Sequence, residues 1–489
     1  MKQKPNVIYI LADDMGYGDV SAFNEKAAFK TPNFDEMAAC GLSFTDAHAT
    51  SAVCTPSRYG ILTGRYNWRS RLKCGVMSGY SSPLIEEDRM TVAHLFKQNG
   101  YRTAAIGKWH LGMEFAKTEE FELLPEFETC AGVDYSGKIE RSPITNGFDY
   151  YYGISASLDM APYIYIENDH FTQMPDHETE DVGKRFWRKG PTAPDFVHEE
   201  VLPHLTQKVL DKIEEYKEEP FFIYFPMPAP HTPILPSKEF LGKSGTNEYG
   251  DFVLMVDEML GRVTRKLKET GLYENTIVIM TSDNGCSPMA NFEELLAAGH
   301  NPSYVFRGHK ADIYEGGHRI PLIVRWPEVI PAGGRSDEIV CLCDFMATMA
   351  DILETELPPE AAVDSVSNLP IWLDPDMPAV RSDLIHQSVC GDLSIRMGRF
   401  KLEMCPGSGG WSYPAPGEET ADMPRFQLYD LSNDISERVN VIEQHPAIAQ
   451  RLKKQLVKYV REGRSTPGPK QQNNGEEIWD AVRWLEEEP

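Results

Sequence analysis

The sequence predicts an α/β protein built on a mixed, mostly parallel sheet that is flanked by helices. Four runs rich in apolar and β-branched residues indicate buried strands, because strands covered on both faces lack the alternation of half-exposed ones. These runs are 6–12, 102–107, 220–225 and 276–282. Helical patterns lie between the runs, which is the order of elements typical of α/β folds. The helices are predicted at 31–40, 90–99, 201–217 and 251–271.

Short-range signals justify these elements in chain order. Pro32 near the start of the first helix and Gly41 after its end follow the usual asymmetry of helix termini. Gly100 stops the second helix in the same way. The acidic segment 114–141 has no clear period, and we interpret it as an insertion or lid. Segment 160–189 mixes aromatic and polar residues, so it is either an ordinary surface loop or a loop suited to stacking on sugar rings.

A second, smaller unit with an α+β pattern is predicted at the C-terminus. Proline and acidic residues crowd 354–376, and we therefore place the domains at 1–365 and 366–489. Beyond this boundary, short strands separated by turns predict an antiparallel sheet. These strands are expected at 383–387, 393–397, 400–404 and 426–431. A helix at 447–461 is expected to pack on the sheet, and a short helix is expected at 476–485.

Composition and net charge limit the possible classes of function. The 489 residues include 41% hydrophobic and 25% charged residues, as in an ordinary globular protein large enough for two domains. No apolar run is long enough to span a bilayer, so no membrane span is expected. The net charge of −26 argues against nucleic acid and anionic membranes as partners, because both require basic patches.

The cysteine pattern leaves two interpretations open. Nine cysteines at irregular spacing form neither a paired zinc-ligand array nor a dense disulfide framework. Some of them would pair in an oxidising compartment, and the alternative is a set of buried free thiols. The sequence does not indicate which cysteines would pair.

Acidic and amide residues follow two of the predicted buried strands. Asp13 and Asp14 come directly after the first strand, and Asp283 and Asn284 come directly after the strand at 276–282. Ligands of open α/β sheets gather outside the carboxyl ends of strands, so we expect these side chains to meet. Oxygen ligands without imidazole or thiolate select a hard cation. For the aspartate pair alone, a solvated turn is the alternative.

One motif carries the strongest functional signal. Cys54-Thr55-Pro56-Ser57-Arg58 is continued by Leu62-Thr63-Gly64-Arg65. These two segments resemble the activation motif of the type I sulfatases, a branch of the alkaline phosphatase superfamily. The resemblance extends in motif order over essentially the whole chain, and it implies an alkaline-phosphatase-like α/β domain with a small C-terminal α+β subdomain.

The resemblance implies a covalent chemistry for Cys54. In that family a maturation enzyme oxidises the cysteine to formylglycine, whose aldehyde hydrates to a geminal diol. One hydroxyl attacks sulfur and the other collapses back to the aldehyde and expels sulfate, so one hard displacement becomes two easier steps. Arg58 would hold the diol oxygens, a role that suits a permanently charged planar group. The helix that begins after Cys54 would direct its N-terminal amides at the anion.

Further segments resemble the sulfate-binding motifs of the family. Gly-Lys-Trp-His-Leu-Gly at 107–112 implies that Lys108 and His110 bind sulfate oxygens and assist collapse of the diol. The spelling Pro-His-Thr-Pro after a Phe-rich strand implies that His231 contacts the scissile oxygen. Lys310 precedes the segment Glu-Gly-Gly-His-Arg-Ile-Pro, and the resemblance implies that it contacts the sulfate and the leaving oxygen. The resemblance also favours calcium at the acidic site, with magnesium possible.

Three further residues are predicted to bind the substrate. Ser157 is the nearest match to a polar residue that meets the sulfate in the family. His170, in the aromatic segment, is predicted to recognise the sugar. A histidine is unusual at position 318 of its motif, and His318 is expected either to contact the substrate or to pack in the core.

The sequence as a whole predicts a sulfuric ester hydrolase that acts on a sulfated sugar, of galactose or N-acetylgalactosamine type, from a host or algal glycan. Two alternatives remain: a phosphonate or phosphate monoester hydrolase on the same scaffold, and a catalytically silent sulfoglycan-binding protein. The expected partners are the sulfated carbohydrate and the formylglycine-generating enzyme. No secretory leader precedes the first strand, so the protein is cytoplasmic if the chain is complete. We expect a leader to have been removed from a periplasmic, cell-surface or secreted bacterial protein, because the family is mostly exported and no usable glycosylation sequon is present.

Overall fold

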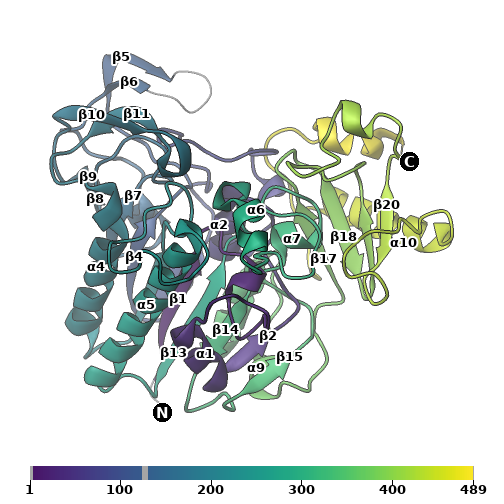
Figure 1. The fold of residues 1–489 in the computed structure, drawn as a ribbon, viewed down its shortest axis with the longest axis horizontal. Helices are drawn as coiled ribbons and strands as arrows, with labels where there is room; N and C mark the ends of the chain where they lie inside the picture. Colours follow the sequence, from purple (N-terminus) through teal and green to yellow (C-terminus); the bar gives the residue numbers. More distant parts are fainter. Residues whose placement is uncertain (1–3, 124–129, 488–489) are drawn as a thin grey trace.

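The computed structural model describes residues 4–123 and 130–487. Its main element is a mixed sheet, seen near the centre of Figure 1. The strands of this sheet are β1 (Asn6–Ala12), β2 (Leu42–Phe44), β4 (Arg102–Lys108), β7 (Tyr150–Ile154), β8 (Ile166–Glu167), β9 (His170–Phe171), β12 (Phe221–Pro226), β13 (Thr276–Ser282), β14 (Leu322–Arg325) and β15 (Gly334–Ser336). Their order across the sheet is β15-β2-β14-β13-β1-β12-β4-β7-β8-β9.

The centre of the sheet is parallel and its flanks are mixed. Strands β13, β1, β12, β4 and β7 run parallel, with Tyr9 of β1 level with Tyr224 on one side and Ile279 on the other. Strands β14, β8 and β9 join antiparallel. The predicted α/β class with a mixed, mostly parallel sheet is therefore confirmed. Because the central strands share one direction, their carboxyl ends meet at one edge of the sheet.

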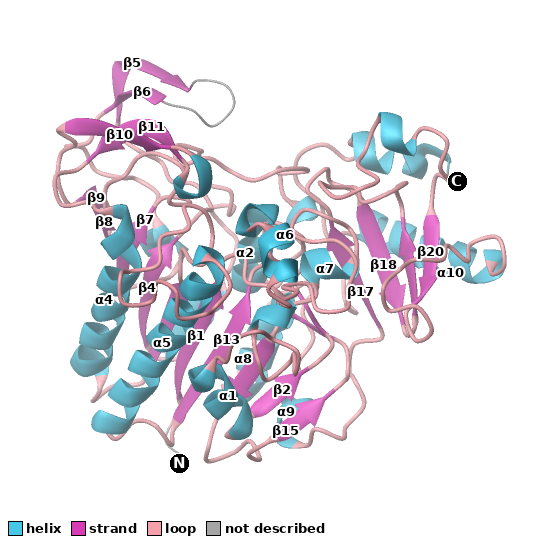
Figure 2. Ribbon diagram, in the orientation of Figure 1, coloured by secondary structure: helices cyan, strands magenta, loops and turns pink. Residues whose placement is uncertain are grey.

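Helices cover the sheet in two groups, as Figure 2 shows. Helices α1 (Pro32–Ala39) and α4 (Val201–Tyr216) both pack on α5 (Glu248–Glu269), and α4 also contacts β4, β7 and β12. Helices α2 (Cys54–Thr63), α3 (Val92–Gln98) and α8 (Phe345–Ile352) form the other group. Aromatic contacts hold this group to the strands, with ring centroids 4.7 Å apart for Tyr9 and Phe345 and 4.3 Å apart for Phe96 and Phe222.

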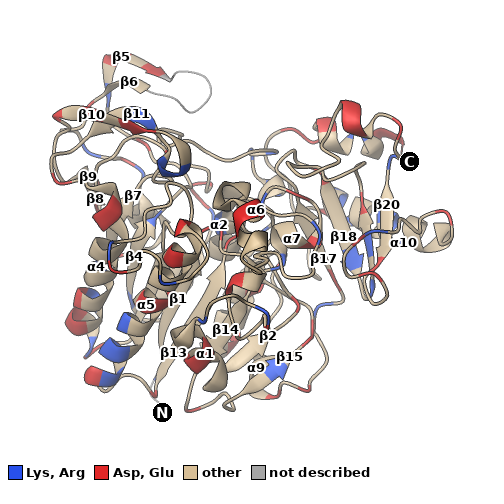
Figure 3. Cartoon of the chain, in the orientation of Figure 1, with Lys and Arg blue, Asp and Glu red and all other residues tan. Residues whose placement is uncertain are grey.

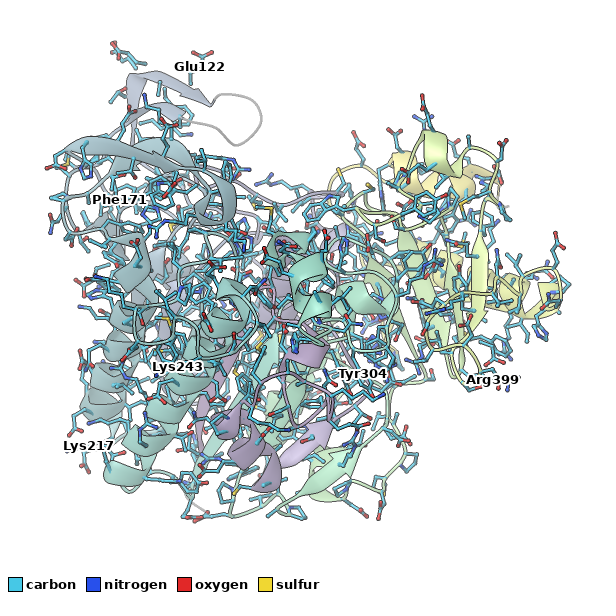
Figure 4. The ribbon with its side chains drawn as sticks, viewed as in Figure 1. Glu122, Phe171, Lys217, Lys243, Tyr304 and Arg399 are labelled. Carbon is cyan, nitrogen blue, oxygen red and sulfur yellow. The ribbon has the colours of Figure 1, made fainter. Side chains whose placement is uncertain are left out.

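The C-terminal part folds into the predicted antiparallel sheet. Its strands are β17 (Asp383–Gln387), β18 (Leu393–Met397), β19 (Phe400–Glu403) and β20 (Gln427–Asp430), in that order. Helix α10 (Pro446–Glu462) packs on β18 and β19, and the β18–β19 turn carries Arg399, labelled at the right of Figure 4. The apolar core beneath this sheet also takes in Tyr66 and Trp68 from the N-terminal part. The boundary between 365 and 366 stays a prediction.

Several segments differ from the sequence prediction. Helix α5 begins at Glu248 rather than 251, because the Asn247 side chain accepts hydrogen bonds from the amides of Tyr249 and Gly250 and caps the helix earlier. The segment 160–189, expected to be a loop, contains β8, β9, β10 (His177–Asp181) and the start of β11 (Trp187–Thr192). These strands are short and mostly polar, so their pairing depends on neighbours rather than on an apolar pattern of their own.

Other connecting segments also carry short elements. The predicted insertion 114–141 includes the hairpin strands β5 (Lys117–Leu123) and β6 (Cys130–Val133), while 124–129 of it lie outside the described residues. The expected helix at 476–485 is a 3₁₀ helix at Asp480–Glu487. Among the described residues, the remaining short strands and α-helices are β3 (Ala47–His48), β16 (Val340–Cys341), α6 (Phe292–Ala297), α7 (Glu315–His318) and α9 (Leu369–Leu373).

Charged residues of both signs occur along the outer helices, as the blue and red segments of α4 and α5 in Figure 3 show. An ion pair joins the two helices, between Lys266 and Glu214 at 2.5 Å. Such exposed pairs add little stability, but they keep the surface polar. Across residues 4–123 and 130–487, no helix has both the length and the apolar character that a membrane crossing requires.

Candidate active site

The acidic residues predicted to meet do meet at the carboxyl edge of the sheet. Asp13 and Asp14 directly follow β1, and Asp283 and Asn284 directly follow the neighbouring β13. The amide of Asp14 donates to Asp283 Oδ1 at 3.2 Å, and Asn284 Nδ2 donates to Asp14 Oδ1 at 2.8 Å. All four residues are at most 1% exposed. Two strands that are distant in sequence thus build one buried acidic site.

Cys54 lies against this acidic site. It is the first residue of α2 and is buried, and its Sγ lies within 4.8 Å of carboxylate oxygens of Asp13 and Asp14 and of a ring nitrogen of His231. Among the described residues, no side chain caps the start of α2 at Val53, so the first-turn amides keep their affinity for an anion. Cys54 and the aspartates that follow β1 therefore belong to one site.

Arg58, one turn into α2, connects the cysteine helix to both strands. Its guanidinium donates to Asp283 Oδ2 from Nε at 3.1 Å and from Nη2 at 2.7 Å, and from Nη1 to the carbonyl oxygen of Lys108 at 3.0 Å. Its Nη2 also lies 3.6 Å from Asp13 Oδ1. Only a planar group with several donors satisfies these partners together.

Two lysines complete the charge balance. Lys108, at the end of β4, donates from Nζ to Asp13 Oδ2 at 2.6 Å and to Ser157 Oγ at 2.5 Å. Lys310 Nζ lies 2.7 Å from both carboxylate oxygens of Asp14. Ser157, which the sequence placed near the sulfate, therefore does lie at the site.

The buried charges shift one another's proton affinity. Burial opposes ionisation of Asp13, yet Lys108, His231 and Arg58 together hold the pKa of its carboxyl well below the usual range. Burial and the neighbouring Asp13 carboxylate raise the pKa of Asp283 to about 7. Burial also raises the pKa of the Cys54 thiol to about 12, so at neutral pH this side chain is an uncharged thiol.

Two histidines, His110 and His231, each place one ring nitrogen at the site. His110 Nε2 donates to the carbonyl oxygen of Met77 at 2.7 Å, so its Nδ1 carries a lone pair, and this buried atom has no hydrogen-bond partner among the described residues. Burial, then Lys108 and Arg58, hold the His110 pKa well below the usual range, so the ring is neutral. His231 Nδ1 is bonded to the carbonyl oxygen of Thr232, and its Nε2 lies 3.6 Å from Asp14.

The oxygen donors fit a hard cation. Within the described parts of the chain, the buried Asp13 Oδ1 and Asn284 Oδ1 accept no hydrogen bond. Unpartnered buried acceptors are costly, and a cation would satisfy both. With the carboxylates of Asp14 and Asp283 beside them, the donor set is made of oxygen alone and suits calcium or magnesium.

The structure does not bring two predicted substrate residues to this site. His170 lies on the edge strand β9, exposed and bonded to Asp169, next to Phe171, which is labelled at the upper left of Figure 4. His318 is fully buried, with His48 Nδ1 3.0 Å from its Nδ1 and the His386 ring stacked at 3.5 Å. Both of its ring nitrogens already face His48, Lys401 and the carbonyl oxygen of Ile313, so its position supports the packing alternative.

Sequence reasoning missed the groups that hold His110 in place. Thr55 Oγ1 donates to the carbonyl oxygen of His110 at 3.0 Å and accepts from the amide of Met77 at 3.1 Å. Thr55 is the variable position of the Cys-x-Pro-Ser-Arg motif, and Met77 acts through a backbone carbonyl. Neither contact leaves a signal in the residue pattern.

A buried acidic site, three cations and a helix N-terminus at the carboxyl edge of a parallel sheet define a hydrolase for anionic esters with the alkaline-phosphatase-like fold. Residues 5–355 match the sulfatase family model. The chain therefore belongs to the sulfatase family, and it is a sulfuric ester hydrolase.

Similar proteins support this assignment. The chain is 34% identical to an N-acetylgalactosamine-6-O-sulfatase of Bacteroides thetaiotaomicron, over 93% of each chain. It is 28% identical to the N-acetylgalactosamine-6-sulfatase of Rattus norvegicus, over 91% of this chain and 86% of the relative. A solved sulfatase structure from the glycosaminoglycan metabolism of B. thetaiotaomicron superposes with a TM-score of 0.81 at 33% identity, covering 93% of this chain and 99% of that one.

Replacement of Arg58 tests the charge network. Arg58→Lys keeps the charge but cannot donate to Asp283 and to the Lys108 carbonyl together, so we expect kcat for a sulfate ester to fall by roughly 100-fold or more. Arg65→Lys is the matched control, because Arg65 is equally buried but bonds Tyr59 and Glu86 instead. Equal losses of kcat in the two folded variants would contradict a specific role for Arg58.

Proposed function

We propose that this sulfatase removes 6-O-sulfate from N-acetylgalactosamine or galactose-type residues of a glycan. The single observation that carries the proposal is the 34% identity, over 93% of both chains, to an N-acetylgalactosamine-6-O-sulfatase. The rat relative carries the same substrate in its name at 28% identity. Because the sulfatase family is mostly exported, we also propose export of the protein.

We propose that Cys54 is the site of conversion to formylglycine by a maturation enzyme. The support is the Cys-Thr-Pro-Ser-Arg motif together with the position of Cys54 at the start of α2 and against the acidic site. The uncharged thiol that burial favours is a poor nucleophile. When formed, the hydrated aldehyde supplies one hydroxyl that attacks sulfur and a second hydroxyl whose deprotonation allows sulfate to leave.

We propose calcium as the resident cation, held by Asp13, Asp14, Asp283 and Asn284, with magnesium as the alternative. The support is the set of oxygen donors and the two acceptors without hydrogen-bond partners. A bound cation supplies Lewis acidity that neutralises charge on a sulfate oxygen. The positive groups beside the site also explain how an acidic protein receives an anionic substrate, since local charge decides binding.

We assign different roles to the other residues around Cys54 according to how deeply each is buried. Arg58 and Lys108 are 0% exposed and lie on the inner side, where they hold anionic oxygens without water. His110 Nδ1, with its free lone pair, accepts the proton of the second hydroxyl. His231 and Lys310 are 9% and 5% exposed, so they face the entrance, where the leaving alcohol departs and needs a proton.

Mass spectrometry of the peptide that contains Cys54 tests catalysis against silent binding. After co-expression with a formylglycine-generating enzyme, we expect an aldehyde or its hydrate at position 54 and release of sulfate. Cys54→Ala should abolish turnover, whereas Cys40→Ala, at a cysteine outside the site, should keep it. An unmodified cysteine in protein from the native host would instead support the sulfoglycan-binding alternative.

Metal removal tests the cation site through stability as well as activity. Calcium that binds only the folded state should raise the free energy of unfolding by about 2.7 kcal/mol at one hundred times its Kd. Asp13→Asn should lose most of this gain, measured by thermal unfolding with and without calcium. The control Asp257→Asn, in α5 and away from the cation site, should keep it, because its carboxylate accepts from the amides of Asn33 and Phe34 instead. A calcium response that survives in Asp13→Asn would contradict the assignment.

A panel of esters tests the substrate. We expect 6-O-sulfated N-acetylgalactosamine or galactose to release sulfate with kcat/KM at least about tenfold above the 4-O-sulfated isomers, because fixed polar contacts orient only one isomer correctly. Matched phosphate and phosphonate monoesters should be poorer still. Faster turnover of the phosphonate would favour the alternative hydrolase. If none of the sulfated sugars released sulfate, the proposed substrate would be wrong.

A further inference from the structure

Two exposed cysteines outside the active site lie in neighbouring segments. Cys74 comes after α2, and Cys390 lies in the turn between β17 and β18. Both residues line one surface cavity of about 750 Å³, together with Trp479. Thiols at such a surface can meet dissolved reagents, which distinguishes them from the buried cysteines of the chain.

Backbone contacts between the residues that flank Cys74 and those that flank Cys390 hold the two segments together. The amide of Gly75 donates to the carbonyl oxygen of Val389 at 2.7 Å. A Cβ placed on Gly391 would lie 2.5 Å from the carbonyl oxygen of Lys73 and 3.4 Å from the Cβ of Cys74. Residues 73 and 75 flank Cys74, while 389 and 391 flank Cys390, so the backbone brings the two cysteines close together, as a disulfide requires.

Gly391 makes this close approach possible. Its φ of +88° is in the left-handed region, and any side chain would collide with the Lys73 carbonyl. Gln387 adds a second attachment, because its Nε2 donates to the same carbonyl oxygen at 2.7 Å. Besides burial and Asp392, the Cys74 thiol also raises the pKa of Cys390, which agrees with their proximity.

The other close cysteine pair offers no comparable site. Cys341 and Cys343 have sulfur atoms 3.4 Å apart, but both are buried in the core beneath the C-terminal sheet. An oxidant therefore reaches the exposed pair and not this one.

We propose that Cys74 and Cys390 form a disulfide when the protein meets a disulfide-bearing oxidant. One thiolate attacks the oxidant disulfide and releases one of its halves as a thiol. The second cysteine then displaces the other half from the mixed disulfide. The protein loses two electrons and two protons, and the oxidant disulfide is reduced to two thiols.

This bond would join the two segments that hold residues of the active site. The segment after Cys74 contains Met77, whose carbonyl oxygen accepts from His110. On the other side, the amide of Val389 donates to the carbonyl oxygen of Ala311, next to Lys310. A covalent link would therefore restrain the C-terminal sheet against the active-site segments, whatever the identity of the substrate.

Peptide mapping without reduction tests the proposal on the wild-type protein. After incubation with oxidised glutathione and alkylation, we expect one peptide that joins Cys74 to Cys390, while dithiothreitol returns both as alkylated thiols. Free Cys74 and Cys390 after oxidation, or a Cys341–Cys343 link in their place, would overturn the proposal.

Thermal unfolding gives a second, independent readout. Because the link closes a long loop, oxidation should raise the wild-type Tm by about 2 °C or more relative to the reduced protein. Cys74→Ser and Cys390→Ser should each lose this gain, and Cys40→Ser should keep it. A gain that persists in Cys74→Ser would overturn the proposal, and none of these results depends on catalytic activity.

Discussion

The mutual compensation of buried charges at one edge of the sheet is the constraint on which the structure depends. Three aspartates are held almost without solvent, and each would be costly there without a partner. Arg58, Lys108 and Lys310 supply those partners from α2, β4 and the segment before α7. Since each cation comes from a different part of the chain, the fold must close correctly before any of these charges is balanced.

The backbone around the site is held in unusual conformations. Asp14 and His110 both have positive φ, 64° and 58°, which non-glycine residues rarely adopt. Such conformations cost roughly 1–3 kcal/mol each and persist only where surrounding contacts fix them. The Asp14 contacts to Asn284 and Lys310 and the His110 contacts to Thr55 and Met77 are of this kind. These surrounding contacts therefore hold the site in a conformation that is preorganised to bind charged groups.

A second buried cluster joins the C-terminal sheet to the catalytic part. Asp46 bonds His48, His48 contacts His318, and Lys401 Nζ of β19 lies 3.1 Å from His318 Nε2. If His318 accepts from Lys401 and donates to His48, every nitrogen along this line has a partner without any metal ion. The His48–His318 pair is then a structural junction, which supports packing rather than substrate contact for His318. Lys401 also bonds Glu437, so the junction extends into the C-terminal part.

The sequence by itself determined the α/β class, the antiparallel C-terminal sheet and the residues that converge at the site. Continuous apolar runs identify buried strands, and the polar residues that follow them must lie at the carboxyl edge once the strands are parallel. The tertiary structure alone decided the short polar strands in 160–189, the burial of His318, the exposed position of His170 and the carbonyl that orients His110. These features depend on long-range pairing and on backbone groups, which carry no residue pattern. The adjacency of Cys74 and Cys390 belongs to the same class, because only folding brings two such distant turns together.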